Sequence, residues 1–266
     1  MTRTFAGHVV FVTGGGRGIG RHITLAFARE GAHVVINCFR DPETATRTLD
    51  EVLQAGGSAQ LLPGTVTDRA GVADMFRTIA DQHGRLDVLV NNAASGRFGP
   101  LDAIRDRDWS RALSTNAGGA LWCAQAARPL LERARRSAIV NLSSSGAGGV
   151  LPAYAGVGVS KAAVEALTRY LAVEYGPLGI RVNAVSGGLI EGDGTTKLPE
   201  AERLEAAVRA ATPLRRTGTP AELAHVVLFL ASPAASWITG QVLHADGGLS
   251  ITHPVYAMTM GADRDR

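Results

Sequence analysis

A tyrosine and a lysine stand seven positions apart in the segment YAGVGVSK, which runs from Tyr154 to Lys161. A phenol has an ordinary pKa of about 10, so it becomes a usable proton donor near neutral pH only beside a fixed positive charge. On a helix, seven residues make nearly two turns, which places both side chains on one face, about 10 Å apart along the axis. The pair therefore predicts proton-transfer chemistry in which an ammonium group assists a phenol.

A glycine-rich segment near the start of the chain predicts a dinucleotide site. In TGGGRGIG, the glycines Gly14, Gly18 and Gly20 follow a strand-like run and open a helix, with Ile19 between the last two. Glycines allow the backbone to turn tightly and approach a pyrophosphate, whose charge the helix N-terminus stabilises. An ordinary tight turn is the alternative, but the position between a strand and a helix favours the dinucleotide.

The end of the second strand-like run indicates which dinucleotide binds. An acidic residue there would hold the ribose diol of NAD and repel a 2′-phosphate. Cys38 occupies that position, Arg40 follows two residues later, and Arg17 lies in the glycine-rich turn. Guanidinium groups bind phosphate well, so these residues favour NADPH, although Asp41 close by argues the other way.

The composition indicates one globular domain and argues against several classes of function. The chain has 266 residues, of which 45% are hydrophobic, enough for one sizeable core. No apolar run reaches the roughly 18 residues that span a bilayer, and the N-terminus lacks a signal-peptide pattern, so we expect a cytoplasmic protein. The net charge of +3 is dispersed and aromatic residues make up 5%, which argues against nucleic acid. Neither the seven histidines nor the two cysteines show ligand spacing, so we expect no metal.

Short runs rich in valine and isoleucine alternate with longer amphipathic stretches. The runs show little polar alternation, as expected of parallel strands buried on both faces. The pattern predicts an α/β fold, a single-domain Rossmann-like doubly wound parallel sheet of about seven strands with helices on both faces. We expect one domain over residues 1–266, with a core over 6–250 and a tail over 251–266. The predicted strands cover residues 8–12, 32–37, 59–63, 86–90, 137–142, 180–185 and 241–245.

Helix boundaries are marked at several places. Gly31 follows the first amphipathic stretch and predicts its end. Thr219, Pro220 and Glu222 form the pattern of a capping box at the start of another helix. Residues 108–134 are predicted to form one helix.

Several segments, taken together and in order, resemble the short-chain dehydrogenase/reductase family from about residue 6 to residue 250. These segments are TGGGRGIG, NNAA, STNAGG, NLSSSG, the segment with Lys161, RVNAVSGG and ITGQVLHADGG. The resemblance implies that Asn116 holds a water in a proton relay and that Ser144 orients the substrate. It implies that Lys161 binds the nicotinamide ribose and lowers the pKa of a tyrosine hydroxyl. It also implies cofactor contacts from Thr65, Val66, Asn92, Ala93, Gly187 and Ile190.

Three positions depart from the family pattern. The family's tyrosine stands four residues before the lysine, where this chain has Val157, which cannot donate a proton. After the sixth predicted strand, the usual Pro-Gly pair is replaced by Gly187 and Gly188. A threonine that contacts the nicotinamide carboxamide is replaced by Gly192. We therefore expect a looser hold on the nicotinamide from the loop over residues 187–200.

The displaced Tyr154 suggests a different reduction. In ketone reduction, the hydride goes to the carbonyl carbon and the proton goes to the oxygen bonded to it. In reduction of an α,β-unsaturated thioester, the hydride goes to the β-carbon and negative charge develops on the thioester oxygen, so the donor must lie further away. The spacing Tyr-x6-Lys and the segments NNAASG and VNAVSGG resemble the NADPH-dependent enoyl-acyl-carrier-protein reductases of type III. A second, upstream tyrosine of those enzymes is replaced here by Val150.

Three functions stay open at this point. The first is an NADPH-dependent enoyl-thioester reductase in which Tyr154 and Lys161 stabilise the enolate, assisted by Ser144 and Asn116. The second is an NADPH-dependent carbonyl reductase, in which Tyr154 reaches the site through a shifted helix start or Ser144 and a water act as the donor. The third is a protein that binds the cofactor but catalyses little, as a sensor or scaffold.

The resemblance also implies partners. The substrate would be a small-molecule acyl thioester, carried by CoA or by an acyl carrier protein. The helices over residues 108–134 and 154–175 and the segment HADGGLS would join copies of the chain into a homotetramer. Arginines near the predicted loop are either solvated surface residues or a patch that steers an acidic carrier protein. They are Arg203, Arg209, Arg215 and Arg216.

Overall fold

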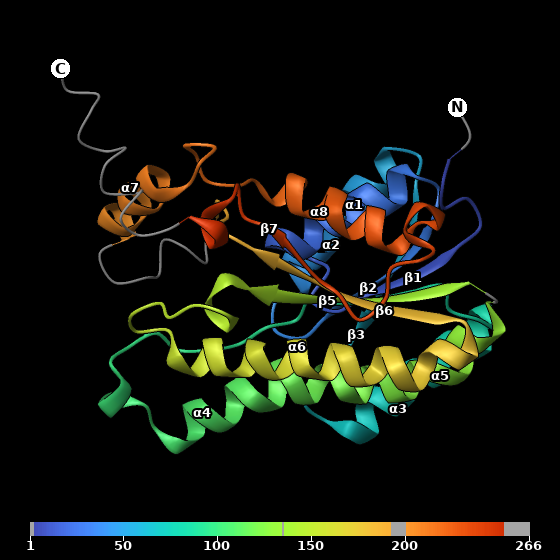
Figure 1. Cartoon of the computed structure of the whole chain (residues 1–266). Helices are drawn as coiled ribbons and strands as arrows, with labels where there is room; N and C mark the ends of the chain where they lie inside the picture. The colour runs from blue at the N-terminus through green and yellow to red at the C-terminus, as the bar shows by residue number, and fades with distance from the viewer. Residues whose placement is uncertain (1–2, 135, 193–200, 253–266) are drawn as a thin grey trace.

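The structure, a computed structural model, describes residues 3–134, 136–192 and 201–252. Seven strands form one parallel sheet in the order β3-β2-β1-β4-β5-β6-β7, which confirms the predicted fold class (Figure 1). The predicted loop residues 193–200 and tail residues 253–266 lie outside the described part of the chain. The strands are β1 (Val9–Val12), β2 (His33–Cys38), β3 (Ser58–Pro63), β4 (Val88–Asn91), β5 (Ser137–Ser144), β6 (Ile180–Gly187) and β7 (Val242–Ala245).

Helices cover both faces of the sheet. Helices α1, α2 and α8 pack on one face, and α3, α5 and α6 pack on the other (Figure 1). Helix α4 lies beside α6, and α7 lies beyond the carboxyl ends of β6 and β7. The helices are α1 (Gly18–Arg29), α2 (Pro42–Gln54), α3 (Arg69–His83), α4 (Asp106–Leu113), α5 (Gly119–Arg133), α6 (Ala155–Tyr175), α7 (Ala201–Ala211) and α8 (Pro220–Ala231).

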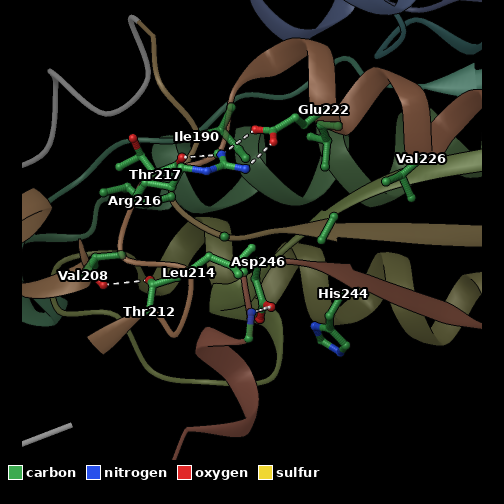
Figure 2. A pocket seen from close by; sticks show the side chains of 17 residues that line it. Ile190, Val208, Thr212, Leu214, Arg216, Thr217, Glu222, Val226, His244 and Asp246 are labelled. Atoms are coloured by element: carbon green, nitrogen blue, oxygen red, sulfur yellow. Dashed lines mark hydrogen bonds and ion pairs between the residues drawn. The ribbon is translucent and has the colours of Figure 1, made fainter. Parts of the chain in front are cut away.

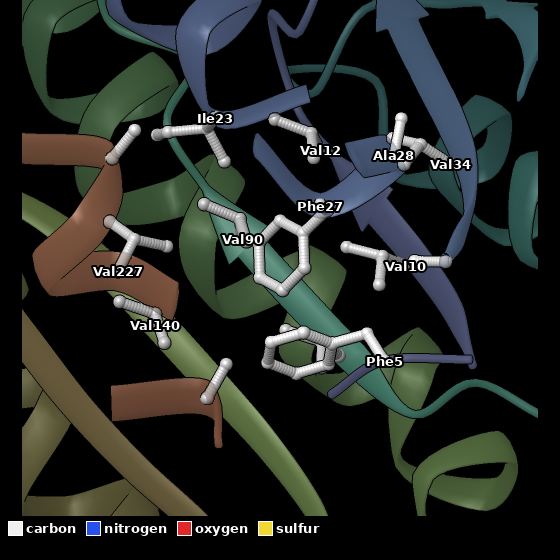
Figure 3. Close-up of a cluster of buried hydrophobic side chains, with 14 of the residues drawn as sticks. Phe5, Val10, Val12, Ile23, Phe27, Ala28, Val34, Val90, Val140 and Val227 are labelled. Atoms are coloured by element: carbon white, nitrogen blue, oxygen red, sulfur yellow. The ribbon is translucent and has the colours of Figure 1, made fainter. Parts of the chain in front are cut away.

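Two apolar cores explain why the strands are hydrophobic without interruption. Successive strand residues point to opposite faces, and each face is covered by helices. Val10 and Val12 of β1 therefore join the core under α1 and α8, where Phe27 is also buried (Figure 3). Phe11 joins the opposite core, where its ring lies edge-on to Phe76 at a centroid distance of 5.1 Å. Neither face of the central strands is left to water.

Two helix boundaries lie where local residue types predicted them. Helix α1 ends at Arg29, and Gly31 shortly beyond it adopts a φ of 88°, which favours glycine. Helix α8 begins with the predicted capping box, because the Thr219 side chain accepts from Glu222 N–H while the Glu222 carboxylate accepts from Thr219 N–H. Both helix boundaries were predicted from local residue types.

Residues 106–133 are helical without a break, as predicted for residues 108–134, but the helix is not regular throughout. Helices α4 and α5 are separated by a π turn over Ser114–Gly118. Such turns widen the helix by one residue and disturb its regular ladder. The buried side chain of Asn116 stabilises the turn through hydrogen bonds to Ser95 and Ser160.

The strand order places the functional segments at one edge of the sheet. The chain runs outward from β1 to β3, then returns to β4 on the other side of β1. Ligands of doubly wound sheets bind at the carboxyl ends of the strands beside such a reversal. The glycine-rich turn after β1 and the NNAA segment after β4 meet at this point. No helix in the described ranges is both long and apolar enough to cross a membrane.

Candidate active site

The glycine-rich turn packs against the end of β4. Gly14 and Gly18 adopt φ values of 63° and 51°, a conformation that favours glycine. A Cβ on Gly20 would lie 2.1 Å from the carbonyl oxygen of Gly14 and 2.5 Å from Nδ2 of Asn92. The Asn92 carboxamide donates to the carbonyl oxygens of Thr13 and Gly14 at 2.9 and 3.1 Å. The turn therefore admits no side chain at Gly20 and is held closed from the neighbouring strand.

The start of α1 beside this turn fits an anion. Arg17 is its N-cap residue, and the Arg17 side chain accepts no hydrogen bond from the first-turn N–H groups. A Cβ on Gly18 would meet nothing within 4 Å, so the space next to the turn is open. Ile19 follows and is half-buried. Uncapped N–H groups and close-approaching glycines are the features that hold a dinucleotide pyrophosphate. The residues present therefore fit a nicotinamide dinucleotide.

The residues predicted to choose between cofactors lie at and beyond the end of β2. Cys38 is the last residue of β2 and is buried, which raises the pKa of its thiol. Arg17 and Arg40 are exposed. Asp41, which argued against NADPH, caps α2 by accepting from Thr44 N–H at 3.0 Å. Hydrogen bonding from Thr44 and, more weakly, the charge of Arg17 lower the pKa of the Asp41 carboxyl. Its carboxylate therefore makes a hydrogen bond at the start of α2.

Three more predicted cofactor residues lie at the ends of β3 and β4. Thr65 and Val66 follow β3, and the Val66 side chain packs against Gly119, where a Cβ would lie 2.7 Å from Cγ2. Ala93 follows β4 and donates its N–H to Thr13 Oγ1 at 3.0 Å. The parallel sheet thus brings segments far apart in the sequence to one edge.

Tyr154 lies just outside α6 as its N-cap residue, with a φ of −114°, and not within the helix as the spacing argument assumed. Its hydroxyl lies 3.2 Å from Oγ of Ser144, at the end of β5. Its ring stacks on Phe98 at a centroid distance of 5.6 Å and an interplanar angle of 13°. Burial raises the pKa of the Tyr154 phenol, and the hydrogen bond with Ser144 lowers it in part. The structure therefore brings two of the predicted catalytic residues into contact.

Lys161 is buried two turns into α6, with 6% of its surface exposed. Its ammonium group donates to the carbonyl oxygen of Leu142 at 2.5 Å. Loss of hydration on burial lowers the pKa of Lys161 to about 8. The ammonium group is therefore charged at neutral pH but close to its titration.

Asn116 is bound to two neighbouring segments. Its carboxamide accepts from Ser95 N–H at 2.8 Å and donates to the carbonyl oxygen of Ser95 at 3.0 Å. It also donates to Ser160 Oγ at 2.7 Å, and Ser160 in turn donates to the carbonyl oxygen of Val157. These bonds tie the π turn to the start of α6. The predicted role of Asn116 in holding a water stays a prediction.

The position where the family carries its tyrosine is filled by hydrocarbon. Val157 is buried. A Cβ on Gly96 would lie only 2.1 Å from Cγ2 of Val157, so the valine side chain packs against the backbone of Gly96. Val150, at the position of the second tyrosine, is 96% exposed. Neither residue supplies a hydroxyl, so Tyr154 and Ser144 are the hydroxyl groups brought together here.

A cavity of about 240 Å³ lies at the carboxyl ends of β6 and β7 (Figure 2). It is lined from α7, from the start of α8 and from the β7 end. The Arg216 guanidinium points to the Glu222 carboxylate there and holds the pKa of that carboxyl at about 2. Among the described residues predicted for the site, Ile190 lines this cavity and Tyr154 does not. Gly187, which ends β6, pairs in register with Ser144. The cavity therefore begins beside the end of β5 that carries Ser144, because Gly188, next to Gly187, lines it.

Phe98, Gly96 and Ser160 were missed from the sequence. Phe98 and Gly96 lie in an irregular loop, where spacing carries no information about contacts. Ser160 precedes Lys161 directly, so its polar side chain inside an apolar stretch was a usable signal. Among the described residues, no group of three metal-ligating side chains is found.

Known proteins resemble this chain over most of its length. A family model described as Enoyl-(Acyl carrier protein) reductase matches residues 14–250. A 1-cyclohexenylcarbonyl-CoA reductase from Streptomyces collinus is 39% identical over 255 residues, which cover 95% of this chain and 90% of that protein. The 3-oxoacyl-[acyl-carrier-protein] reductase FabG from Staphylococcus aureus is 38% identical over 238 residues, covering 90% of this chain and 96% of that protein.

Solved structures agree with the fold. A protein from Agrobacterium tumefaciens, provisionally named a gluconate dehydrogenase, superposes with a TM-score of 0.90 at 29% identity, covering 95% of this chain and all of that one. A protein from Sinorhizobium meliloti, provisionally named a short-chain alcohol dehydrogenase, superposes with a TM-score of 0.88 at 34% identity and the same coverage. Reductases of this kind use a nicotinamide cofactor, which the glycine-rich turn fits. With its sheet order, its glycine-rich turn and these relatives, the chain belongs to the short-chain dehydrogenase/reductase family of oxidoreductases.

Proposed function

We propose that the protein is an NADPH-dependent reductase of the carbon–carbon double bond of an enoyl thioester. The observation that carries this proposal is that buried Val157 fills the family's tyrosine position, so the displaced Tyr154 before α6 is the phenol left to act on the substrate. A donor displaced along α6 suits an anion that develops away from the carbon receiving the hydride. The relative from Streptomyces collinus, named for reduction of an enoyl-CoA, supports the same reaction class.

Each predicted catalytic side chain has a separate role in this reaction. When bound, the dihydronicotinamide supplies the hydride. Tyr154 and Ser144 donate hydrogen bonds to the thioester oxygen, where negative charge develops as the β-carbon is reduced. Lys161, charged below about pH 8, binds the cofactor ribose and lowers the cost of that negative charge. Asn116 keeps α6 in place through Ser160. Solvent then supplies the proton to the α-carbon.

NADPH is the proposed cofactor because of the residues beyond β1 and β2. Arg17 and Arg40 are exposed guanidinium groups, and Cys38 leaves the end of β2 without a carboxylate. The carboxylate of Asp41 is engaged in capping α2. A 2′-phosphate would therefore meet two positive charges, which outnumber the ionised carboxylate of Asp41 close by.

A carbonyl reductase is the second candidate, and one contact favours it. Because Tyr154 is an N-cap residue, its hydroxyl reaches Ser144, the residue that orients a ketone in this family. The relative from Staphylococcus aureus is named for reduction of a 3-oxoacyl thioester. The two candidates differ in whether the hydroxyl pair serves a thioester oxygen or a ketone oxygen.

One assay separates the candidates. NADPH oxidation is followed by absorbance with crotonyl-CoA and, separately, with acetoacetyl-CoA. We expect turnover of crotonyl-CoA that falls about 10²- to 10³-fold in Tyr154→Phe. Tyr170→Phe serves as the matched control, because Tyr170 lies on α6, the helix that Tyr154 precedes, and is 71% exposed. Turnover of acetoacetyl-CoA alone would contradict the enoyl reductase and support the carbonyl reductase. Binding of NADPH without turnover of either thioester would support the third function, a protein that binds the cofactor but catalyses little.

A further inference from the structure

The loop over residues 96–99 contacts the segment around Tyr154 at three points. Gly99 N–H donates to the carbonyl oxygen of Ala153 at 2.9 Å. Phe98 stacks on the Tyr154 ring with an interplanar angle of 13°. Gly96 leaves room for Val157, whose Cγ2 atom lies 2.1 Å from where a Cβ of residue 96 would stand. The loop therefore contacts both the displaced Tyr154 and Val157, the residue at the family's usual tyrosine position.

The backbone alone does not hold the Tyr154 side chain. Tyr154 precedes the first residue of α6, so the preceding turn of a helix does not restrict its rotamers. Ala153 before it has a φ of 62°, a conformation that alanine rarely adopts without support from its surroundings. The phenol keeps its place through contacts made by its ring and its hydroxyl.

Three groups make those contacts. Oγ of Ser144 lies 3.2 Å from the hydroxyl. The backbone of Gly146 lies close to the ring, since a Cβ there would stand 2.6 Å from Cδ1 and Cε1. Phe98 supplies the aromatic contact and comes from a separate segment of the chain, after β4. Removing the Phe98 ring would leave the phenol free to turn away from Ser144.

We propose that Phe98 is a positioning residue that keeps the Tyr154 hydroxyl on Ser144. This inference rests on the proposed function only in taking Tyr154 as the group that meets the substrate. Stacked aromatic pairs favour one arrangement of the two rings by an amount that corresponds to roughly a threefold to tenfold population shift. The same ring shields the phenol from water, which contributes to the burial that raises its pKa.

The test compares four full-length variants. Phe98→Leu and Phe98→Met keep an apolar side chain without an aromatic ring, and Phe98→Tyr restores the ring. Leu101→Ala is the matched control, because Leu101 lies three residues after Phe98, at the start of a short 3₁₀ helix, and is 70% exposed. For each variant, kcat is measured with the thioester that the wild type reduces, and the Kd of NADPH is measured by fluorescence.

We expect kcat to fall about threefold to tenfold in Phe98→Leu and Phe98→Met, with the Kd of NADPH unchanged. Phe98→Tyr should restore most of the rate, and Leu101→Ala should match the wild type. Unchanged kcat in both aliphatic variants would overturn the proposal, as would an equal loss in Phe98→Tyr.

A second readout needs no substrate. The phenolate is titrated by ultraviolet difference spectroscopy. From each variant the same variant with Tyr154→Phe added is subtracted, which removes the other tyrosines, three in the aliphatic variants and four in Phe98→Tyr. The Tyr154 pKa should fall toward its ordinary value in both aliphatic variants, because water reaches the ring, and stay raised in Phe98→Tyr. An unchanged pKa in the aliphatic variants would contradict the positioning role. If the thioester assay instead identifies a ketone as substrate, the enoyl proposal fails while this titration still decides the role of Phe98.

Discussion

The ammonium group of Lys161 lies inside the protein and donates to a backbone carbonyl oxygen of β5. A buried ammonium group loses hydration, so its pKa falls to about 8. Such a group is useful at an active site because it keeps its charge at neutral pH and still lies close to a reacting group. The same shift links the titration of Lys161 to the stability of the fold.

We predict that Lys161 makes folding more favourable as the pH rises through its folded-state pKa. The unfolded chain holds the lysine proton up to about pH 10.5, whereas the folded chain releases it near pH 8. Between these values the unfolded state binds more protons, so the free energy of unfolding increases with pH. Relative to Lys161→Met, the wild type should gain about 2 kcal/mol between about pH 8 and about pH 10.

Urea unfolding of both proteins without cofactor measures this difference. Between about pH 6 and about pH 7 both states hold the proton, so the difference between wild type and variant should stay constant and serves as the internal control. A flat difference across the alkaline range would mean that Lys161 keeps an ordinary pKa in the folded protein.

Helix boundaries at the carboxyl edge of the sheet position the candidate site. Helix α6 begins just after Tyr154 and carries Lys161 into the interior, while the π turn before α5 presents Asn116 to α6. Helix α8 begins at a capping box that follows Gly218. Gly218 N–H donates to the carbonyl oxygen of Leu189 at 2.9 Å, so this helix start also holds the segment that follows β6.

Loss of the α8 cap should lower stability measurably. Thr219→Ala removes the side-chain acceptor of the Glu222 N–H group, and such losses cost about 1 kcal/mol. Thr78→Ala on α3 is the matched control, because the Thr78 hydroxyl donates to the Asp74 carbonyl oxygen of its own helix and caps no helix start. Urea unfolding should show a lower free energy of unfolding for Thr219→Ala and no loss for Thr78→Ala. Equal stability of the two variants would show that the cap contributes nothing.

The whole molecule brings distant segments to one binding edge because all described strands of its sheet are parallel. Arg17 follows β1 and Arg40 follows β2, and these strands are neighbours in the sheet. Two exposed guanidinium groups therefore lie at the same edge. Assembly into a homotetramer, implied by the family resemblance, stays a prediction.

We predict that Arg40→Ser lowers kcat/KM for NADPH about tenfold and leaves kcat/KM for NADH nearly unchanged. The lost interaction is a charge-assisted contact with the 2′-phosphate, which NADH lacks. Arg77→Ser on α3 is the control, since Arg77 pairs with Asp74 on an exposed helix face. Steady-state rates with both cofactors give the ratio. Parallel losses with NADPH and NADH would assign Arg40 a role unrelated to the phosphate.

Local sequence features determined the elements of this protein and much of its binding edge. Short apolar runs predicted all seven strands to within a few residues. The central strands are rich in valine and isoleucine because a strand buried on both faces needs apolar side chains at nearly every position, whereas β3 and β7 are partly exposed. Thr219 and Glu222 predicted a helix start, since a cap is made by residues close in the chain. Gly14, Gly18 and Gly20 predicted the turn after β1, because their backbone conformation and close contacts exclude side chains.

Tertiary structure alone decided how the hydroxyl groups meet. The spacing of Tyr154 and Lys161 suggested two residues on one helix face, but Tyr154 stands outside the helix and its hydroxyl reaches Ser144. That placement depends on a positive φ at Ala153 and on stacking with Phe98, which is 56 residues away in the chain. Contacts of this kind are set by how separate segments pack, and periodicity along a sequence carries no record of them.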